Sequence, residues 1–71
     1  MDLLLTRGMR RLAFEFKTSL APNLSRGFWN ACNDIAPDHT YVVIPEGDRY
    51  ELKESVSVIS LSDLIQPGQM Q

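Results

Sequence analysis

The chain has 71 residues, enough for one small domain and too few for two. Its single cysteine excludes an internal disulfide, and its net charge of −2 argues against broad, non-specific binding to nucleic acid. Because a domain of this size hides only about 60% of the surface of its unfolded chain, we expect it to form a homo-oligomer or to dock onto a larger protein.

The charges are distributed unevenly along the chain. Residues 1–27 carry five basic and two acidic side chains, whereas residues 28–71 carry two basic and seven acidic ones. The basic first part keeps nucleic acid as a candidate partner, although solvated surface charges explain the same pattern. Met1–Leu5 is too short for the core of a signal peptide, and no apolar run reaches the about 20 residues of a membrane span. The sequence therefore predicts a cytoplasmic protein without membrane contact.

Two strands joined by a tight turn are predicted over residues 3–6 and 11–17. Gly8 supplies the backbone conformation that a hairpin turn commonly needs. Side chains alternate between the two sides of a strand, so the second strand has an apolar side and a more polar side. Leu12, Phe14 and Phe16 form the apolar side, and Ala13, Glu15 and Lys17 form the more polar side.

A helix is predicted over residues 24–35, since apolar residues recur there at steps of three and four. Asn23 or Ser25 caps its start, and Pro37 ends it. Cys32 lies on the apolar stripe and is expected to act as a small buried hydrophobe, and Trp29 is expected to seal the edge of the core. His39 follows a turn and is expected at the surface.

The rest of the chain predicts strands over residues 41–44, 50–53 and 56–59 and a short helix over 61–65. The continuous apolar run at 41–44 is typical of an interior strand. The fold class is thus α/β or α+β: a small mixed β-sheet in the order strand, strand, helix, strand, strand, short helix. Residues 1–65 form one domain, and residues 66–71 are expected to be a flexible tail.

The helix at 24–35 should form a crossover between two parallel strands and cover one face of the sheet. The other face is partly apolar, and we expect it to be covered by something outside this chain. A symmetric dimer would supply that cover.

Asp2, Glu15 and Lys17 are the candidate site residues. Two carboxylates bind Mg²⁺ beside a phosphate in metal-dependent phosphodiesterases, and a lysine there steadies the attacking water or the developing charge. Asp2 and Glu15 would be the metal ligands and Lys17 the catalytic residue. The alternative explanation is that Glu15 and Lys17 are simply a charged pair on one side of a solvated strand.

The stretches Asp2-Leu3-Leu4-Leu5 and Phe14-Glu15-Phe16-Lys17-Thr18-Ser19 resemble the Asp…Glu-x-Lys core of the PD-(D/E)xK nuclease-like superfamily. Residues 2–65 resemble, more closely, the C-terminal nuclease-like domain of bacterial and archaeal AAA-type predicted ATPases, a domain of unknown function. Four stretches carry this second resemblance: Lys17-Thr18-Ser19, Leu24-Ser25-Arg26-Gly27-Phe28-Trp29-Asn30, Tyr41-Val42-Val43 and Val58-Ile59-Ser60-Leu61.

The resemblance implies a restriction-endonuclease-like core, with Asp2, Glu15 and Lys17 at the positions of the metal-binding and catalytic residues. The superfamily's leading helix and first strand have no counterpart before Asp2, and no glycine-rich loop for ATP is present. We therefore expect a truncated, stand-alone piece without ATPase activity. Two functions follow: a small interaction or oligomerisation domain or, alternatively, a Mg²⁺-dependent nuclease completed by dimerisation.

Overall fold

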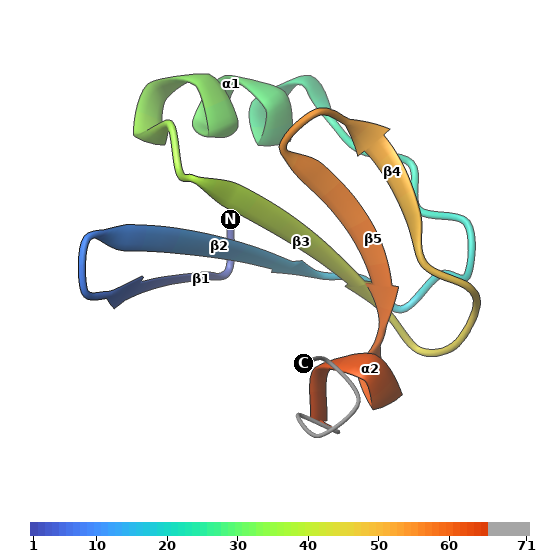
Figure 1. Cartoon of the computed structure of the whole chain (residues 1–71). Coiled ribbons are helices and arrows are strands. Elements are labelled where there is room, and N and C mark those ends of the chain that lie inside the picture. The colour runs from blue at the N-terminus through green and yellow to red at the C-terminus, as the bar shows by residue number, and fades with distance from the viewer. Residues whose placement is uncertain (66–71) are drawn as a thin grey trace.

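A hairpin of two antiparallel strands begins the chain and forms one side of a five-stranded sheet (Figure 1). The computed structural model describes residues 1–65, so the expected tail at 66–71 lies outside the described residues. The elements are β1 (Leu3–Arg7), β2 (Arg10–Phe16), α1 (Arg26–Ile35), β3 (His39–Ile44), β4 (Tyr50–Lys53), β5 (Val56–Ser60) and α2 (Leu61–Ile65).

The sheet has the strand order β1-β2-β3-β5-β4. β2, β3 and β5 are parallel, and β1 and β4 are added antiparallel at the two edges. The predicted mixed sheet, the parallel strands joined through α1 and the interior position of residues 41–44 are confirmed. Because β5 lies between β3 and β4, the β4–β5 connection is a hairpin at the far edge of the sheet.

The β1–β2 turn consists of Gly8 and Met9, with Arg7 directly opposite Arg10. Gly8 has a φ of 61°, and a glycine with positive φ at the first turn position suits the twist of a two-residue hairpin. The predicted hairpin is therefore present, with its turn where the sequence placed it.

α1 begins two residues later than predicted, at Arg26. Ser25 is its N-cap, because the Ser25 hydroxyl accepts a hydrogen bond of 3.1 Å from the Phe28 N–H. The helix ends at Ile35, and its C-cap is Ala36, whose φ of 49° is left-handed and whose N–H donates to the Cys32 carbonyl. Pro37 follows at once, as expected.

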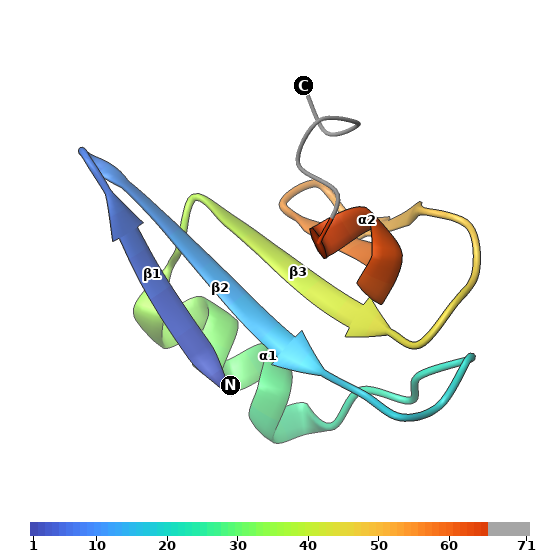
Figure 2. The same ribbon diagram turned by 90° about the horizontal axis from the view of Figure 1, so that it is seen from below.

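Each face of the sheet has its own cluster of buried side chains. On the α1 side, Phe28 packs with Val42, Ile44, Val56 and Val58, and Leu24, Trp29 and Cys32 pack against this cluster. Trp29 and Cys32 thus contact the core as expected, although both are half-buried and Cys32 was expected to be buried. On the other side, which we call the α2 side, Phe14, Val43 and Ile59 pack with Leu12, Tyr41 and Leu64. Figure 2 shows the two helices on opposite sides of the sheet.

The expectation that the second face stays bare is wrong at its centre. Val43 is 2% exposed, Ile59 is 1% exposed and Phe14 is 7% exposed, with Leu64 of α2 packed against their cluster. α2 therefore supplies part of the cover that the sequence left to a partner. The exposed apolar side chains of this face lie nearer its margins.

β2 presents the Ala13 and Glu15 side to α1. Ala13 lies opposite Thr40 and Glu15 opposite Val42, and Val42 is in the cluster beneath α1. Directly opposite residues share a face of the sheet. The side predicted to be the more polar one is thus the helix-covered side, and the Phe14 side faces α2.

Candidate functional site

Glu15 and Lys17 lie together at the carboxyl end of β2. The Lys17 Nζ is 3.5 Å from the Glu15 Oε2, and the Glu15 side chain is only 14% exposed. The amino group of Met1 is 3.3 Å from the other carboxylate oxygen, Oε1. Glu15 is therefore a nearly buried carboxylate flanked by two cations.

Asp2 lies next to this pair, directly before β1. Its carboxylate accepts a hydrogen bond of 2.8 Å from the Phe16 N–H, and its own N–H donates to the Phe14 carbonyl at 3.0 Å. The Asp2 side chain thus holds the start of β1 against the end of β2. The structure brings all three predicted site residues to one end of the hairpin.

This arrangement fits a cation at Glu15 better than at Asp2. The Glu15 Oε1 is buried and accepts no hydrogen bond within the described residues. The Met1 amino group lies 3.3 Å from this oxygen, so a bound metal ion would have to displace it. One Asp2 oxygen is already used by Phe16. Among residues 1–65 no group of three or more metal-ligating side chains is found, so Mg²⁺ would keep most of its ligands as water or substrate oxygens.

A shallow apolar hollow of about 150 Å³ adjoins Lys17. It lies where β2 and β3 end and α2 begins, and it is lined by Phe16, Lys17, Thr18, Val43, Ile44, Pro45 and Leu61. Its size is well below the about 300–1,000 Å³ of small-molecule sites. The hollow therefore adds apolar surface beside Lys17 rather than a substrate pocket.

A second polar cluster, which sequence reasoning missed, lies on the α2 side. His39 is the first residue of β3, and its Nε2 is 2.6 Å from the Ser57 hydroxyl oxygen. Ser57 is fully buried and donates to the Glu51 Oε2 at 2.6 Å. His39 is half-buried, so it still reaches the surface as predicted, but it lies in a strand and not at a turn, because β3 begins two residues earlier than predicted.

This cluster does not have the order of a catalytic triad. In a triad, histidine takes the proton of the serine and the acid binds the histidine. Here Ser57 gives its single proton to Glu51, so the His39 Nε2 must carry the hydrogen of the other bond. Burial lowers the pKa of His39, and the hydrogen bond from Ser57 lowers the pKa of Glu51. The cluster is a structural network within the sheet.

The signal for this cluster in the sequence is alternation. Val56 and Val58 flank Ser57 in a buried strand, so Ser57 faces the opposite side from the two valines. To predict that Ser57 meets His39 and Glu51, one must know the order of the strands in the sheet, and the sequence did not supply that order.

A wider groove of about 490 Å³ lies between α1 and the β4–β5 hairpin. The Lys53 Nζ is 4.6 Å from the centre of the Trp29 ring, which packs edge-on against Phe28. The Cys32 Sγ lies 3.9 Å from the Thr40 hydroxyl oxygen. These contacts explain Trp29 and Cys32 as parts of the core margin.

Exposed leucines gather on β1. Leu3, Leu4 and Leu5 are 42%, 43% and 47% exposed. Leu3 lies opposite Phe14 and Leu5 opposite Leu12, which places these two leucines on the α2 side. Phe16 at the end of β2 is 44% exposed, and Leu61 and Ile65 of α2 are 44% and 65% exposed.

Fold and site together define a small mixed α+β domain with a polar corner at one end of its first hairpin. A family model described as a domain of unknown function, DUF4143, matches residues 1–64. The chain therefore belongs to this family. No curated protein and no solved structure matched it. Among residues 1–65, no helix has the length and apolar character needed to cross a membrane.

Proposed function

We propose that this chain is an interaction domain that self-associates through the exposed leucines of its first strand, β1. One observation carries the proposal: Leu3, Leu4 and Leu5 follow one another on β1, and each is between 42% and 47% exposed. A soluble monomer seldom leaves large apolar side chains clustered on regular structure. A second copy of the chain supplies a surface of the same chemistry.

The small size of the domain supports the same proposal. Within residues 1–65, the buried clusters comprise five residues on the α1 side and three on the α2 side. Cores of this extent give a domain of about 70 residues only a few kcal/mol of stability. Burial of further leucines between two copies adds stability that a single copy does not reach. Membership of a family without assigned activity neither adds to this proposal nor opposes it.

Sedimentation velocity across a dilution series tests the proposal. We expect a concentration-dependent dimer that Leu5→Glu converts to monomer, because the new charge would be buried against apolar surface. Leu52→Glu is the matched control: Leu52 is a 37% exposed leucine on β4, at the other edge of the sheet. A strict monomer at every concentration would contradict self-association and leave docking onto a larger protein as the remaining interaction function.

A Mg²⁺-dependent nuclease is the second candidate function, and one observation favours it. The buried Glu15 Oε1 accepts no hydrogen bond within the described residues, where the Met1 amino group makes an ion pair with it at 3.3 Å, and Lys17 and Asp2 lie beside Glu15. In that function Glu15 and Asp2 bind the metal, and Lys17 steadies the attacking water or the charge that develops on the phosphate. Bound Mg²⁺ supplies the Lewis acid.

Metal titration followed by a cleavage assay tests this second function. We expect Mg²⁺ to raise the melting temperature of the protein and to support nicking of DNA, and both effects to disappear in Glu15→Gln. Lys17→Met should keep the metal effect on melting and lose nicking. Glu54→Gln, a change of an exposed carboxylate away from the hairpin, is the control. An unchanged melting temperature at millimolar Mg²⁺ would rule out this site.

A further inference from the structure

The two edge strands of the sheet differ in how well they are protected. β4 has four residues, carries Glu51 and Lys53, and has a register irregularity between these two residues. Charged side chains, short length and bulges are the devices by which proteins keep an edge strand from pairing with another chain. The β4 edge therefore carries all three.

β1 has none of these devices along its leucines. Its five residues pair with β2 in unbroken register, and every one of them is exposed. Leu4 differs from Leu3 and Leu5 because it faces the α1 side, opposite Ala13, and it is still 43% exposed. Contact through the α2 side alone would leave Leu4 in water. An interface that covers Leu3, Leu4 and Leu5 must reach both sides of the strand.

We propose that β1 pairs antiparallel with β1 of a second copy of this chain, which joins two five-stranded sheets into one. The proposal rests on the self-association proposed above and specifies its geometry. Pairing at the edge satisfies the free backbone N–H and C=O groups of β1 and places side chains of the two copies against each other on both sides of the sheet.

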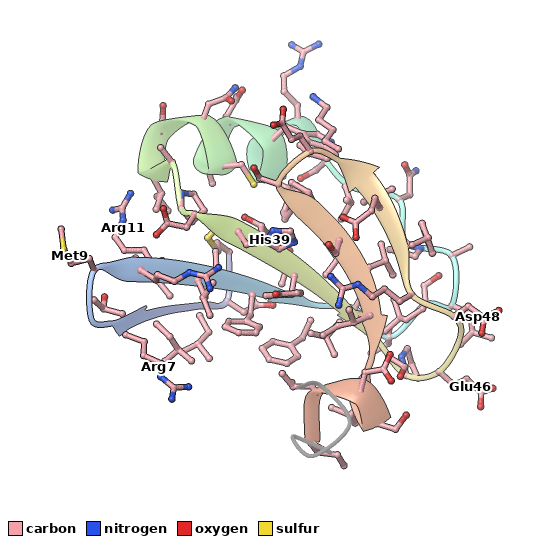
Figure 3. The ribbon with its side chains drawn as sticks, viewed as in Figure 1. Arg7, Met9, Arg11, His39, Glu46 and Asp48 are labelled. Atoms are coloured by element: carbon pink, nitrogen blue, oxygen red, sulfur yellow. The ribbon has the colours of Figure 1, made fainter. Side chains whose placement is uncertain are left out.

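The alternation of side chains restricts the register of this pairing. A twofold axis perpendicular to the sheet puts the α1 sides of both copies on one side of the joined sheet and their α2 sides on the other. Residues that lie directly opposite each other must therefore belong to the same side. Leu3, Leu5 and Arg7 lie on the α2 side, and Figure 3 shows Arg7 pointing away from α1 and Arg11 toward it. Residues with odd numbers therefore lie opposite residues with odd numbers.

Three such registers are centred on the leucines, and one of them matches leucine with leucine throughout. Centring on Leu4 places Leu4 opposite the partner's Leu4, and Leu3 opposite the partner's Leu5. Centring on Leu5 places Leu3 opposite the partner's Arg7. Centring on Leu3 places Leu4 opposite the partner's Asp2. The register centred on Leu4 thus buries all six leucines against apolar neighbours.

The same register keeps the arginines apart. Arg7 lies directly opposite Arg10 at the hairpin turn, so each copy has a pair of like charges at one end of β1. With the twofold axis at Leu4, the two copies of Arg7 are separated by six residues of strand, about 20 Å. At this separation, ions in solution screen their repulsion almost completely.

A single-cysteine cross-link tests both the edge and the register. In a Cys32→Ser background, Leu4→Cys places two thiols directly opposite each other, with the Cα atoms about 5.5 Å apart if the pair is hydrogen-bonded, within the range for a disulfide. We expect Leu4→Cys to give a covalent dimer on mild oxidation. Leu52→Cys, on the protected β4 edge, is the matched control and should stay uncross-linked. A dimer that cross-links through Leu5→Cys and not through Leu4→Cys would overturn the register.

Two charge variants distinguish failure of this geometry from failure of self-association. Leu4→Lys should convert the dimer to monomer by sedimentation, whereas Phe16→Glu should leave it intact, because Phe16 lies on β2 and outside the edge contact. A dimer that Phe16→Glu dissolves and Leu4→Lys spares would support face-to-face self-association and overturn edge pairing. A monomeric unsubstituted protein would overturn both. Circular dichroism of each variant verifies that the sheet is folded.

Discussion

The His39 ring donates its Nε2 hydrogen to the Ser57 hydroxyl, whose oxygen lies 2.6 Å away. The Ser57 proton is used for Glu51, also at 2.6 Å, so Ser57 has no proton to give to the ring. The ring of Tyr41 lies 4.6 Å from that of His39 and restricts its movement. This network connects β3, β4 and β5 on the α2 side. The free energy of unfolding should therefore depend on whether His39 is protonated.

Acidification should destabilise the protein through His39. Burial lowers its pKa below the ordinary value of 6.5, and the nearby Arg49 and Arg10 lower it further, against an opposing effect of Glu51. As the pH falls below 6.5, the unfolded chain binds the proton before the folded protein does, so unfolding is favoured until the folded-state pKa is reached. Urea unfolding across this pH range should show a falling free energy of unfolding.

His39→Gln is the control for this pH dependence. The amide of Gln can still donate to Ser57 but has no proton to gain, so the slope of stability below pH 6.5 should flatten. Loss of stability near the ordinary carboxyl pKa of 4.5 should remain, because the bond from Ser57 lowers the pKa of Glu51 and protonation of this carboxylate weakens that bond. An unchanged slope in His39→Gln would contradict the role of His39.

The capping residue of α1 can be tested with a matched pair of substitutions. Ser25→Ala removes the acceptor of the Phe28 N–H and should lower the free energy of unfolding by about 1 kcal/mol. Asn23→Ala, at the other residue that the sequence offers as a cap, should change it by less than about 0.5 kcal/mol. Chemical denaturation of both variants measures the difference. Equal losses would mean that the helix starts earlier than Arg26.

The sequence predicted every strand and helix of residues 1–65, because the signals are local. Alternation, the glycine of the first turn and the apolar steps of α1 depend on neighbours a few residues away. Two predicted boundaries differ from the observed ones. α1 begins later than predicted because Ser25 caps it, and β3 begins earlier because His39 pairs with Leu12.

The side of β2 that meets α1 could not be predicted from the sequence. Alternation separates Phe14 from Glu15 but does not say which of them faces the helix, since that depends on the register with β3. For the same reason, the sequence predicted that Asp2, Glu15 and Lys17 lie on one hairpin, but it could not predict that Glu15 is nearly buried. The cover of the second face by α2 depends on Leu64, whose short helix gives only a weak signal.

Arg11 should stabilise the carboxyl end of α1. Its guanidinium donates to the carbonyls of Ile35 and of Ala36, the latter at 2.8 Å, and no basic residue lies in the last turn of the helix itself. Arg11→Met removes both bonds and the charge that favours a helix C-terminus, at a cost of about 1 kcal/mol in the free energy of unfolding. Arg7→Met is the control, since Arg7 makes no ion pair within residues 1–65. Similar losses in the two variants, measured by urea denaturation, would argue against this role.

Phe14 and Phe16 should respond differently to the same substitution, although their rings stack 6.5 Å apart on one strand. Phe14 is 7% exposed within the cluster that Leu64 covers, whereas Phe16 is 44% exposed. Phe14→Leu should lower the free energy of unfolding by about 1–2 kcal/mol because it disturbs packing in a closed core, and Phe16→Leu by less than about 0.5 kcal/mol. The comparison is made at a protein concentration below dimer formation, so that association does not contribute. Equal effects would mean that α2 does not close the centre of this face in solution, and the whole face would then be available to a partner.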